Sequence, residues 1–361
     1  KSGSQYSALI SVISGGPKPT PESNTQAAKF LVNIEGIVGA DSIKQLKNLS
    51  KLVSEEITGY DEIGDEALLN AILMDEGALK EAYLKFLKDH GHRCVREAEM
   101  KEKDWSQEPI KLIPVIRNIA KAGDFESKTE DFDMKACLKS LKKTNRLKKM
   151  IIKKLATSVR EAVKMREESK SAAIRFQQKL KFAYIDLALL LHKQGALAEV
   201  EDIFYLTHDE IKEMIEGGKQ DYAAIIKNRR ALDPLYAEMN FQEVYFGHPY
   251  PTESANVAGN NKGTVVSQGN VKGNIRIVRN LSEADKLEKG DIMVCEYTDI
   301  GWSPYFAIIG GIITEIGSPL SHGAVVAREY GIPAIVNMHG AMEQFEDGEE
   351  VVMDTNSEEL I

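Results

Sequence analysis

The sequence lacks several features that would assign it at once to a class of protein. None of its apolar runs approaches the roughly 20 residues that a transmembrane helix needs, so we expect no membrane span. The cysteines Cys94, Cys137 and Cys295 are far apart and odd in number, which predicts neither a disulfide framework nor a zinc site and fits a reducing cytoplasm. There is no Walker A loop, dinucleotide-binding glycine fingerprint or internal repeat.

The N-terminus lacks a methionine and the apolar core of a secretory signal, because the chain begins Lys1-Ser2-Gly3-Ser4. We interpret the chain as a fragment or a cleaved product whose upstream part is not in this sequence. A net charge of −9 disfavours general binding to nucleic acids or to anionic membranes. With 43% hydrophobic and 28% charged residues, the 361-residue chain is typical of a soluble globular protein of two or three domains.

What is present divides the chain into two parts of different periodicity. From about Ala27 to Phe241, apolar residues recur at three- and four-residue spacing, which predicts helices. A Pro-, Gly- and Asn-rich stretch then indicates a linker, and short β-branched runs alternating with helical segments follow it. We therefore expect a mostly α-helical domain over 1–245, a linker over 246–262 and a small β/α domain over 263–361.

One stretch near the C-terminus carries the strongest functional signal. Gly310–Thr314 is a β-branched run bounded by glycines, which predicts a buried strand. Ser321 is placed to cap a helix, and Gly331 with Pro333 behind it predicts where that helix ends. His322 then lies in the first helical turn. Unpaired N–H groups and the helix dipole favour an anion there, such as a phosphoryl group on the imidazole.

The segment 314–336, TEIGSPLSHGAVVAREYGIPAIV, resembles the phosphohistidine segment of the swivelling domain shared by pyruvate phosphate dikinase, phosphoenolpyruvate synthase and rifampicin phosphotransferase. It is most similar to the rifampicin phosphotransferases, as is DIGWSPYF over 299–306 to their D-x-G-W-T-P-L-F run. The resemblance implies that His322 carries a phosphoryl group. Ser318-Pro319 departs from the family, which usually has a second Gly and an apolar residue there. The alternative is that His322 only caps a helix. The candidate phosphate-binding residues are Ser321, Gly323 and Thr314.

A second resemblance lies in the helical part. The run Phe86 to Arg93, the acidic residues Glu97 and Glu99, and WSQEP from Trp105 are similar to the "yGhRg…E…rW.edP" pattern of the acceptor domain in the same phosphotransferases. On the residues alone, His92, Arg93 and Glu97 indicate a solvated helix end with local ion pairing. A metal site at His90 and His92 is disfavoured because i,i+2 positions do not face each other on a helix, so we expect no metal ligands. The resemblance implies substrate-binding roles for His92, Arg93 and Glu97.

Arg166 and Lys170 stand at i and i+4, so both project from one helix face. Two cations on one face repel each other unless an anion or an acid lies between them. The run REESK over 166–170 resembles the R-E-x-x-K motif of the phosphotransferases, and the resemblance implies catalytic roles for Arg166 and Lys170 in phosphoryl transfer. The alternative is a salt-bridged surface helix that uses Glu167 and Glu168.

The resemblance implies a dikinase-type reaction. An ATP-grasp domain in cis, which this chain does not contain, would load His322 from ATP. The swivelling domain would then deliver the phosphoryl group to a hydroxyl of a small-molecule acceptor bound by the helical domain. We expect ATP and Mg²⁺ to be cofactors of the full-length enzyme, bound by the absent domain. The isolated chain should bind neither and should be inactive towards ATP. We expect no nucleic-acid or membrane partner.

Two alternatives stay open. The first is that the chain is part of an enzyme of the phosphoenolpyruvate synthase or dikinase type whose C-terminal barrel is not in the sequence. The order of an acceptor domain, a phosphohistidine domain and then the chain end favours the rifampicin phosphotransferase arrangement. It is also interpretable as a non-catalytic ligand-binding protein on the same scaffold. The presence of His322, Arg166 and Lys170 together counts against that reading.

Overall fold

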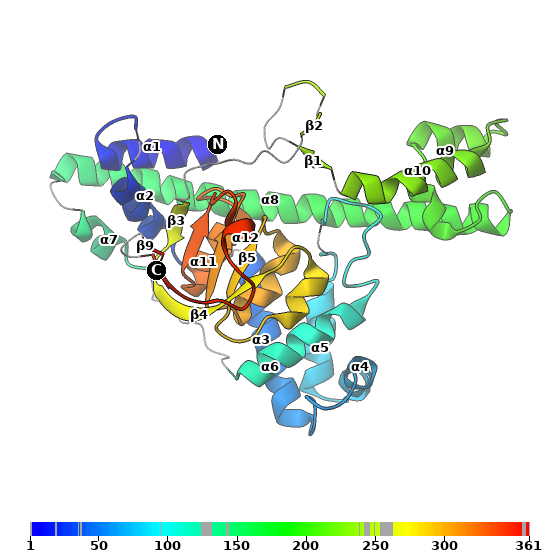
Figure 1. Cartoon of the computed structure of the whole chain (residues 1–361), viewed down its shortest axis with the longest axis horizontal. Helices are drawn as coiled ribbons and strands as arrows, with labels where there is room; N and C mark the ends of the chain where they lie inside the picture. Colours follow the sequence, from blue (N-terminus) through cyan, green and yellow to red (C-terminus); the bar gives the residue numbers. More distant parts are fainter. Residues whose placement is uncertain are drawn as a thin grey trace. The chain divides into compact units, whose positions relative to one another are not determined.

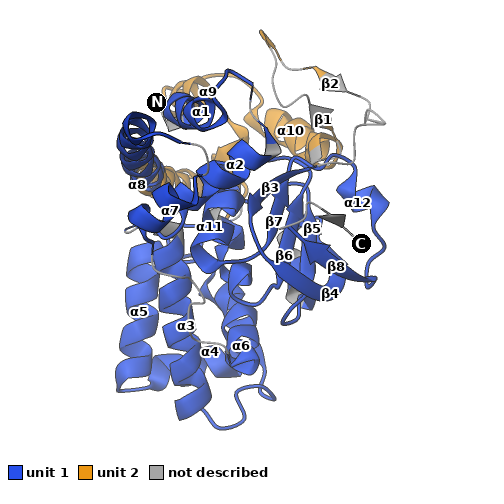
Figure 2. Cartoon of the chain, turned by 90° about the vertical axis from the view of Figure 1, so that its left-hand side faces the viewer, with its two compact units in different colours: residues 1–97, 103–173, 259–361 blue, residues 98–102, 174–258 orange. Residues whose placement is uncertain are grey.

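The computed structural model describes two compact units (Figure 2). Unit 1 comprises residues 1–97, 103–173 and 259–361, and unit 2 comprises residues 98–102 and 174–258. No helix among the described residues has both the length and the apolar character that crossing a membrane requires. The three cysteines form no disulfide. The described residues are 2–18, 20–34, 36, 38–94, 96–123, 132–141, 144–237, 239–241, 246–248, 250–252, 263–355 and 359–360.

The predicted fold class is confirmed, because a mostly helical N-terminal region is followed by a small mixed α/β region. The boundaries at 245 and 263 stay a prediction. Most of the linker expected over 246–262 lies outside the described residues. The α-helices of unit 1 are α1 (Ser2–Ser14), α2 (Pro21–Ala28), α3 (Val38–Glu56), α4 (Asp65–Met74), α5 (Ala78–His90), α6 (Ile113–Ala122), α7 (Met134–Ser140) and the first part of α8 (Arg146–Lys193), with short 3₁₀ turns at Lys29–Leu31 and Pro109–Leu112.

The helical part of unit 1 has two apolar clusters because its amphipathic helices pair their buried faces. Around α3, α5 and α6 the fully buried side chains include Leu46, Leu49, Phe86 and Ile116. A second cluster joins α1 and α2 to the first half of α8. The end of α6 is determined by local sequence. The helix ends at Gly123, whose φ of +66° is the left-handed conformation that terminates helices. Helices α1 and α2 thus pack against the part of α8 that belongs to unit 1.

The β/α region contains a seven-stranded sheet in the order β3-β7-β6-β5-β4-β8-β9 among the described strands. The neighbours β4 and β5, β5 and β6, and β6 and β7 pair in parallel, whereas β3 and β8 lie antiparallel to their partners. Every residue of β5 and β6 is buried, which accounts for their continuous apolar runs. The strands are β3 (Thr264–Ser267), β4 (Asn270–Ile277), β5 (Ile292–Cys295), β6 (Gly311–Thr314), β7 (Ala334–Val336), β8 (Glu350–Asp354) and β9 (Glu359–Leu360).

Helical segments connect these strands: the 3₁₀ helices η4 (Leu281–Lys286) and η5 (Ile300–Ala307), and the α-helices α11 (His322–Tyr330) and α12 (Ala341–Gln344). The predictions of a strand over 310–314, a helix from His322 and its end at Gly331 are confirmed, the last with φ +64°. Helix α11 follows β6, so the β6–α11 connection presents the first turn of α11 at the carboxyl edge of the parallel strands.

The β/α region and the helices of unit 1 share one hydrophobic cluster, in which α3 packs against η5 and α11. Polar contacts accompany this packing. The Glu329 carboxylate accepts from the backbone N–H of Ile34 at 2.8 Å, and the Tyr330 hydroxyl donates to the carbonyl of Ala40 at 2.7 Å. In Figure 2 both regions carry the colour of unit 1. The structure therefore shows the histidine-bearing region docked on the helices.

Unit 2 consists of the distal part of α8, η3 (Val200–Tyr205), α9 (His208–Ile215), α10 (Tyr222–Ala237) and a two-stranded ladder of β1 (Asn240–Phe241) and β2 (Pro251–Thr252). Its buried core includes Leu191, Leu197 and Ile211. Thr207 and Glu210 form a capping box at the start of α9, and Arg229 holds the Glu210 carboxylate with two hydrogen bonds of 2.6 and 2.8 Å. Figure 1 shows α8 as one continuous helix.

The strand glycine Gly273 gives a direct test of the sheet. A Cβ at this position would collide with the carbonyl oxygen of Gly290, and backbone cannot move aside as a flexible side chain can. We expect Gly273→Ala to lower the free energy of unfolding of the β/α region by about 1–3 kcal/mol, the usual cost of overpacking. Chemical denaturation followed by circular dichroism measures this. Gly16→Ala is the control, because a Cβ at Gly16 meets no atom within 4 Å, and equal stability of the two variants would contradict the strand packing.

Candidate functional site

His322 opens α11 and is almost buried, with 9% of its surface exposed. Its Nε2 lies 3.0 Å from the hydroxyl oxygen of Ser303, and its Nδ1 has no hydrogen-bond partner among the described residues. The prediction that His322 lies in the first helical turn is confirmed. Ser321 occupies the N-cap position with extended backbone, but its side chain makes no capping hydrogen bond. The first-turn N–H groups are therefore not satisfied by that side chain.

Ser303 is a site residue to which the sequence reasoning gave no role. It is fully buried on η5, whose N-cap Asp299 accepts from the backbone N–H of Gly301 at 2.9 Å. Asp299 also accepts from the N–H of Arg96 at 2.7 Å, so η5 is tied to the helical part of unit 1. The available signal was the hydroxyl residue in the D-x-G-W-S-P run. Nothing local in the sequence pairs it with a histidine 19 positions later.

The two cations predicted on one face of α8 are both half-exposed, and each has an acidic partner. The Arg166 guanidinium donates to Oε1 of Glu167 over 2.7 and 3.2 Å. The Lys170 Nζ lies 3.1 Å from a carboxylate oxygen of Glu97, and Arg93 Nη1 lies 3.7 Å from the other. The structure thus joins Lys170 to Glu97, 73 positions away in sequence, and through Glu97 to Arg93, both predicted from the second resemblance.

Electrostatics connects this group to the histidine. Burial is the largest cause that holds the pKa of His322 well below its ordinary value, followed by the positive charges of Lys170, Arg93 and Arg166. The imidazole is therefore uncharged at neutral pH, which leaves a ring nitrogen able to act as a nucleophile. His322, Arg166, Lys170 and Arg93 belong to one electrostatic cluster in unit 1.

The other predicted residues are placed less directly. His92 is buried next to Arg93 in sequence, with 6% exposed. Thr314 ends β6, is buried, and its hydroxyl has no hydrogen-bond partner among the described residues. A Cβ at Gly323 would collide with the Thr298 hydroxyl, so the close approach of α11 to that loop requires glycine. Their roles in substrate and phosphate binding stay predictions. In the described part of the chain, no three His, Cys, Asp or Glu side chains come close enough to hold a metal ion.

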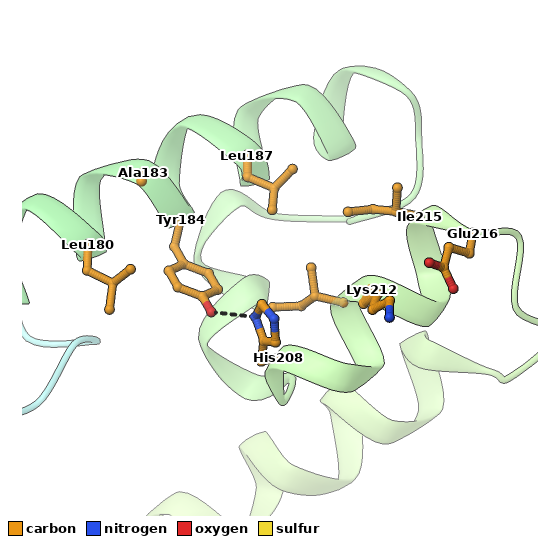
Figure 3. Close-up of a pocket in the computed structure, with 9 residues that line it drawn as sticks. Leu180, Ala183, Tyr184, Leu187, His208, Lys212, Ile215 and Glu216 are labelled. Atoms are coloured by element: carbon orange, nitrogen blue, oxygen red, sulfur yellow. Dashed lines mark hydrogen bonds between the residues drawn. The ribbon is translucent and has the colours of Figure 1, made fainter.

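Unit 2 contains a separate pocket of about 400 Å³ between α8 and α9 (Figure 3). Leu180, Leu187 and Ile215 give it an apolar lining, and the Tyr184 hydroxyl lies 3.0 Å from His208 Nδ1 at its edge. Its volume and mainly apolar lining are in the range of small-molecule sites.

The cluster makes a prediction about the histidine itself. Because the Lys170 charge opposes protonation of His322, Lys170→Met should raise the pKa of His322. Lys164→Met is the matched control on the same helix, since Lys164 is half-exposed and pairs with Glu168 at 3.9 Å. Nitrogen chemical shifts of ¹⁵N-labelled histidine across a pH titration report the change. A His322 pKa that is the same in Lys170→Met and wild type would contradict the cluster.

Comparison with known proteins identifies both parts of the chain. Residues 287–358 match the mobile domain of PEP-utilising enzymes, and residues 3–167 match the fourth domain of rifampicin phosphotransferase. The matched ranges include His322, Arg93, Glu97 and Arg166. Lys170 lies just beyond the second range.

Similar proteins agree with these domain matches. Rifampicin phosphotransferases of Bacillus cereus and Bacillus subtilis are 30% and 32% identical, each over 82% of this chain and 36% of their own length. The prodigiosin synthesizing transferase PigC of Serratia marcescens is 29% identical over 76% of this chain and 32% of its own. The chain thus spans about a third of the length of these relatives. It is a rifampicin phosphotransferase-like member of the proteins that carry the mobile domain of PEP-utilising enzymes.

Proposed function

We propose that this chain is the acceptor-binding and phosphohistidine portion of a phosphotransferase. His322 carries a phosphoryl group and transfers it to a hydroxyl of a small-molecule acceptor bound by the helical region. The observation that supports this most strongly is the buried imidazole at the start of α11, with Nε2 3.0 Å from Ser303. Burial and then the charges of Lys170, Arg93 and Arg166 hold the pKa of this imidazole well below its ordinary value. A doubly negative phosphoryl group is the kind of ligand that such a cluster favours.

In the proposed step the acceptor oxygen attacks phosphorus, the O–P bond forms and the N–P bond of phosphohistidine breaks. Negative charge is spread over the three equatorial oxygens during the transfer, so catalysis consists mainly of positioning and charge neutralisation. Arg166 and Lys170 supply that charge from one face of α8. Ser303, 3.0 Å from Nε2, fixes the orientation of the unphosphorylated ring. The backbone N–H of Gly323, with Ser321 and Thr314, would hold the phosphoryl oxygens.

The donor side of the reaction is assigned to another domain. The resemblance to dikinase-type phosphotransferases supports a separate loading domain. We propose that ATP and Mg²⁺ bind an ATP-grasp domain elsewhere in the full-length enzyme, which loads His322, and that the isolated chain does not turn over ATP. The free thiols of Cys94, Cys137 and Cys295 support a cytoplasmic location. We propose no nucleic-acid or membrane partner.

The acceptor is proposed only as a class. The names of the relatives refer to rifampicin and to prodigiosin synthesis, two different chemistries, so a name does not transfer to this chain. The shared element is a transferase reaction. Pockets between helices are lined mainly by apolar side chains, which fits an acceptor hydroxyl on a largely apolar molecule.

Loading the chain with phosphoramidate, a small phosphoryl donor, tests the proposal without the ATP-grasp domain. We expect mass spectrometry under alkaline conditions to find one phosphoryl group on His322 in the wild type and none in His322→Asn. Arg166→Met and Lys170→Met should retain the label but pass it to an added alcohol about 10²–10³-fold more slowly, because each removes a charge that stabilises the transferring group. Lys164→Met should behave as the wild type.

The other outcomes are equally informative. In the full-length protein, labelling of His322 by phosphoenolpyruvate but not by ATP would move the chain to the phosphoenolpyruvate synthase branch. Absence of label from either donor would contradict a carrier role and would favour a binding protein on the same scaffold. Formation of AMP from ATP by the isolated chain would contradict the assignment of loading to a separate domain.

A further inference from the structure

Glu97 is a buried carboxylate whose oxygens accept no hydrogen bond from the described residues. Its side chain is 4% exposed, and neither carboxylate oxygen has a hydrogen-bond partner among the described residues. Its charge contacts are the ion pairs with Lys170 at 3.1 Å and Arg93 at 3.7 Å. Burying a carboxylate is costly unless both charge and hydrogen bonds are satisfied, so a structural carboxylate normally accepts several hydrogen bonds.

The other buried carboxylates of unit 1 follow that rule. Glu167 accepts two hydrogen bonds from Arg166, and Glu329 accepts the N–H of Ile34 with both of its oxygens. Glu97 has charge compensation alone and retains its acceptor capacity. This distinguishes it from a residue whose role is to hold the fold together.

Glu97 also lies where a proton acceptor is needed. The backbone N–H of Arg96, the residue before Glu97, donates to Asp299 at 2.7 Å, so Glu97 is near the loop that leads into η5 and Ser303. The charge of Glu97, after burial, also raises the pKa of the Asp299 carboxyl. Its ion-pair partners Lys170 and Arg93 both act on His322. Glu97 is therefore a member of the His322 cluster contributed by the helical region, the side from which the acceptor would approach.

We propose that Glu97 is the general base that takes the proton of the acceptor hydroxyl. The inference rests on the proposed function and adds a catalytic residue to it. When the phosphoryl group occupies His322, Lys170 turns from Glu97 towards the phosphoryl oxygens. Once Lys170 has turned away, the Glu97 oxygen that it contacted is open to the acceptor hydroxyl, so the base is released at the stage at which it is used.

The step balances as follows. The oxygen of the acceptor forms the O–P bond while its proton passes to a Glu97 oxygen. The electron pair of the breaking N–P bond stays on the ring nitrogen, and the ring, protonated on its other nitrogen, leaves as neutral imidazole. Glu97 then gives its proton to water and pairs with Lys170 again. No oxidant, reductant or further reactant is needed.

General base catalysis predicts a dependence on the acidity of the hydroxyl. A weakly acidic alcohol needs the base more than an acidic one does, because less of its proton transfer occurs without help. The rate increase that Glu97 provides should therefore be largest with ordinary aliphatic hydroxyls. Among the described residues, Glu97 pairs with Lys170 and Arg93, and its charge acts on Asp299, so all three are kept in the variants used to test the base.

The experiment loads the wild type, Glu97→Gln, Glu97→Asp and Glu168→Gln with phosphoramidate, removes the donor, and follows transfer to ethanol and to trifluoroethanol between pH 5 and 9. We expect Glu97→Gln to load normally and to transfer to ethanol about 10²–10⁴-fold more slowly, with a smaller loss for trifluoroethanol and without the acidic limb of the pH profile. Glu97→Asp should lose less. Glu168→Gln, an exposed carboxylate on α8, should match the wild type.

Three results would overturn the inference. The first is an unchanged transfer rate in Glu97→Gln. The second is an equal loss for both alcohols with the acidic limb retained, which would make Glu97 a positioning residue for Lys170. The third is a Glu97→Asp variant that folds as the wild type and transfers no faster than Glu97→Gln. Failure of the wild type to hold a phosphoryl group on His322, or to transfer it to either alcohol, would instead contradict the proposed function.

Discussion

The candidate site depends on keeping an uncharged imidazole buried among positive charges. Burial opposes protonation of His322 most strongly, and the charges of Lys170, Arg93 and Arg166 oppose it further. Buried or half-buried cations are tolerated only when acids compensate them, and Glu97 and Glu167 do so here. A phosphoryl group on His322 would bring two more negative charges into the same cluster. The unphosphorylated site therefore resembles an anion-binding site in which carboxylates occupy the positions of the anion. Glu97 pairs with Lys170 and Glu167 pairs with Arg166.

The fold makes that preparation possible because two chain regions meet at the cluster. The β6–α11 connection presents His322, while α8 and the segment after α5 present Lys170, Arg93 and Glu97. The shared apolar cluster and the contacts of Glu329, Tyr330 and Asp299 hold the two regions together in this structure. A carrier that must also receive its phosphoryl group elsewhere needs this contact to be reversible. The hydrogen bonds of Glu329, Tyr330 and Asp299 determine how the β/α region is oriented on the helices.

Local sequence was sufficient for the fold class, for the strand over 310–314 and for the helix from His322 to Gly331, because periodicity and glycine conformation act over a few residues. The pairing of Arg166 and Lys170 on one face followed from helical spacing. Local sequence could not predict the contacts Ser303–His322 and Glu97–Lys170, because they join segments brought together only by tertiary packing. At Ser321 the residue type predicted more than the structure contains. Its identity predicted a side-chain cap, whereas the structure uses only its extended backbone at that position.

The most direct test of the central claim is a crystal structure of the chain loaded on His322 and kept at alkaline pH. The account predicts a phosphoryl group on the imidazole of His322, within hydrogen-bond distance of Lys170, with Lys170 no longer 3.1 Å from Glu97. A phosphoryl group on another residue would contradict the carrier role of His322. A loaded structure in which Lys170 remains paired with Glu97 would contradict the exchange of partners on which this account of the site depends.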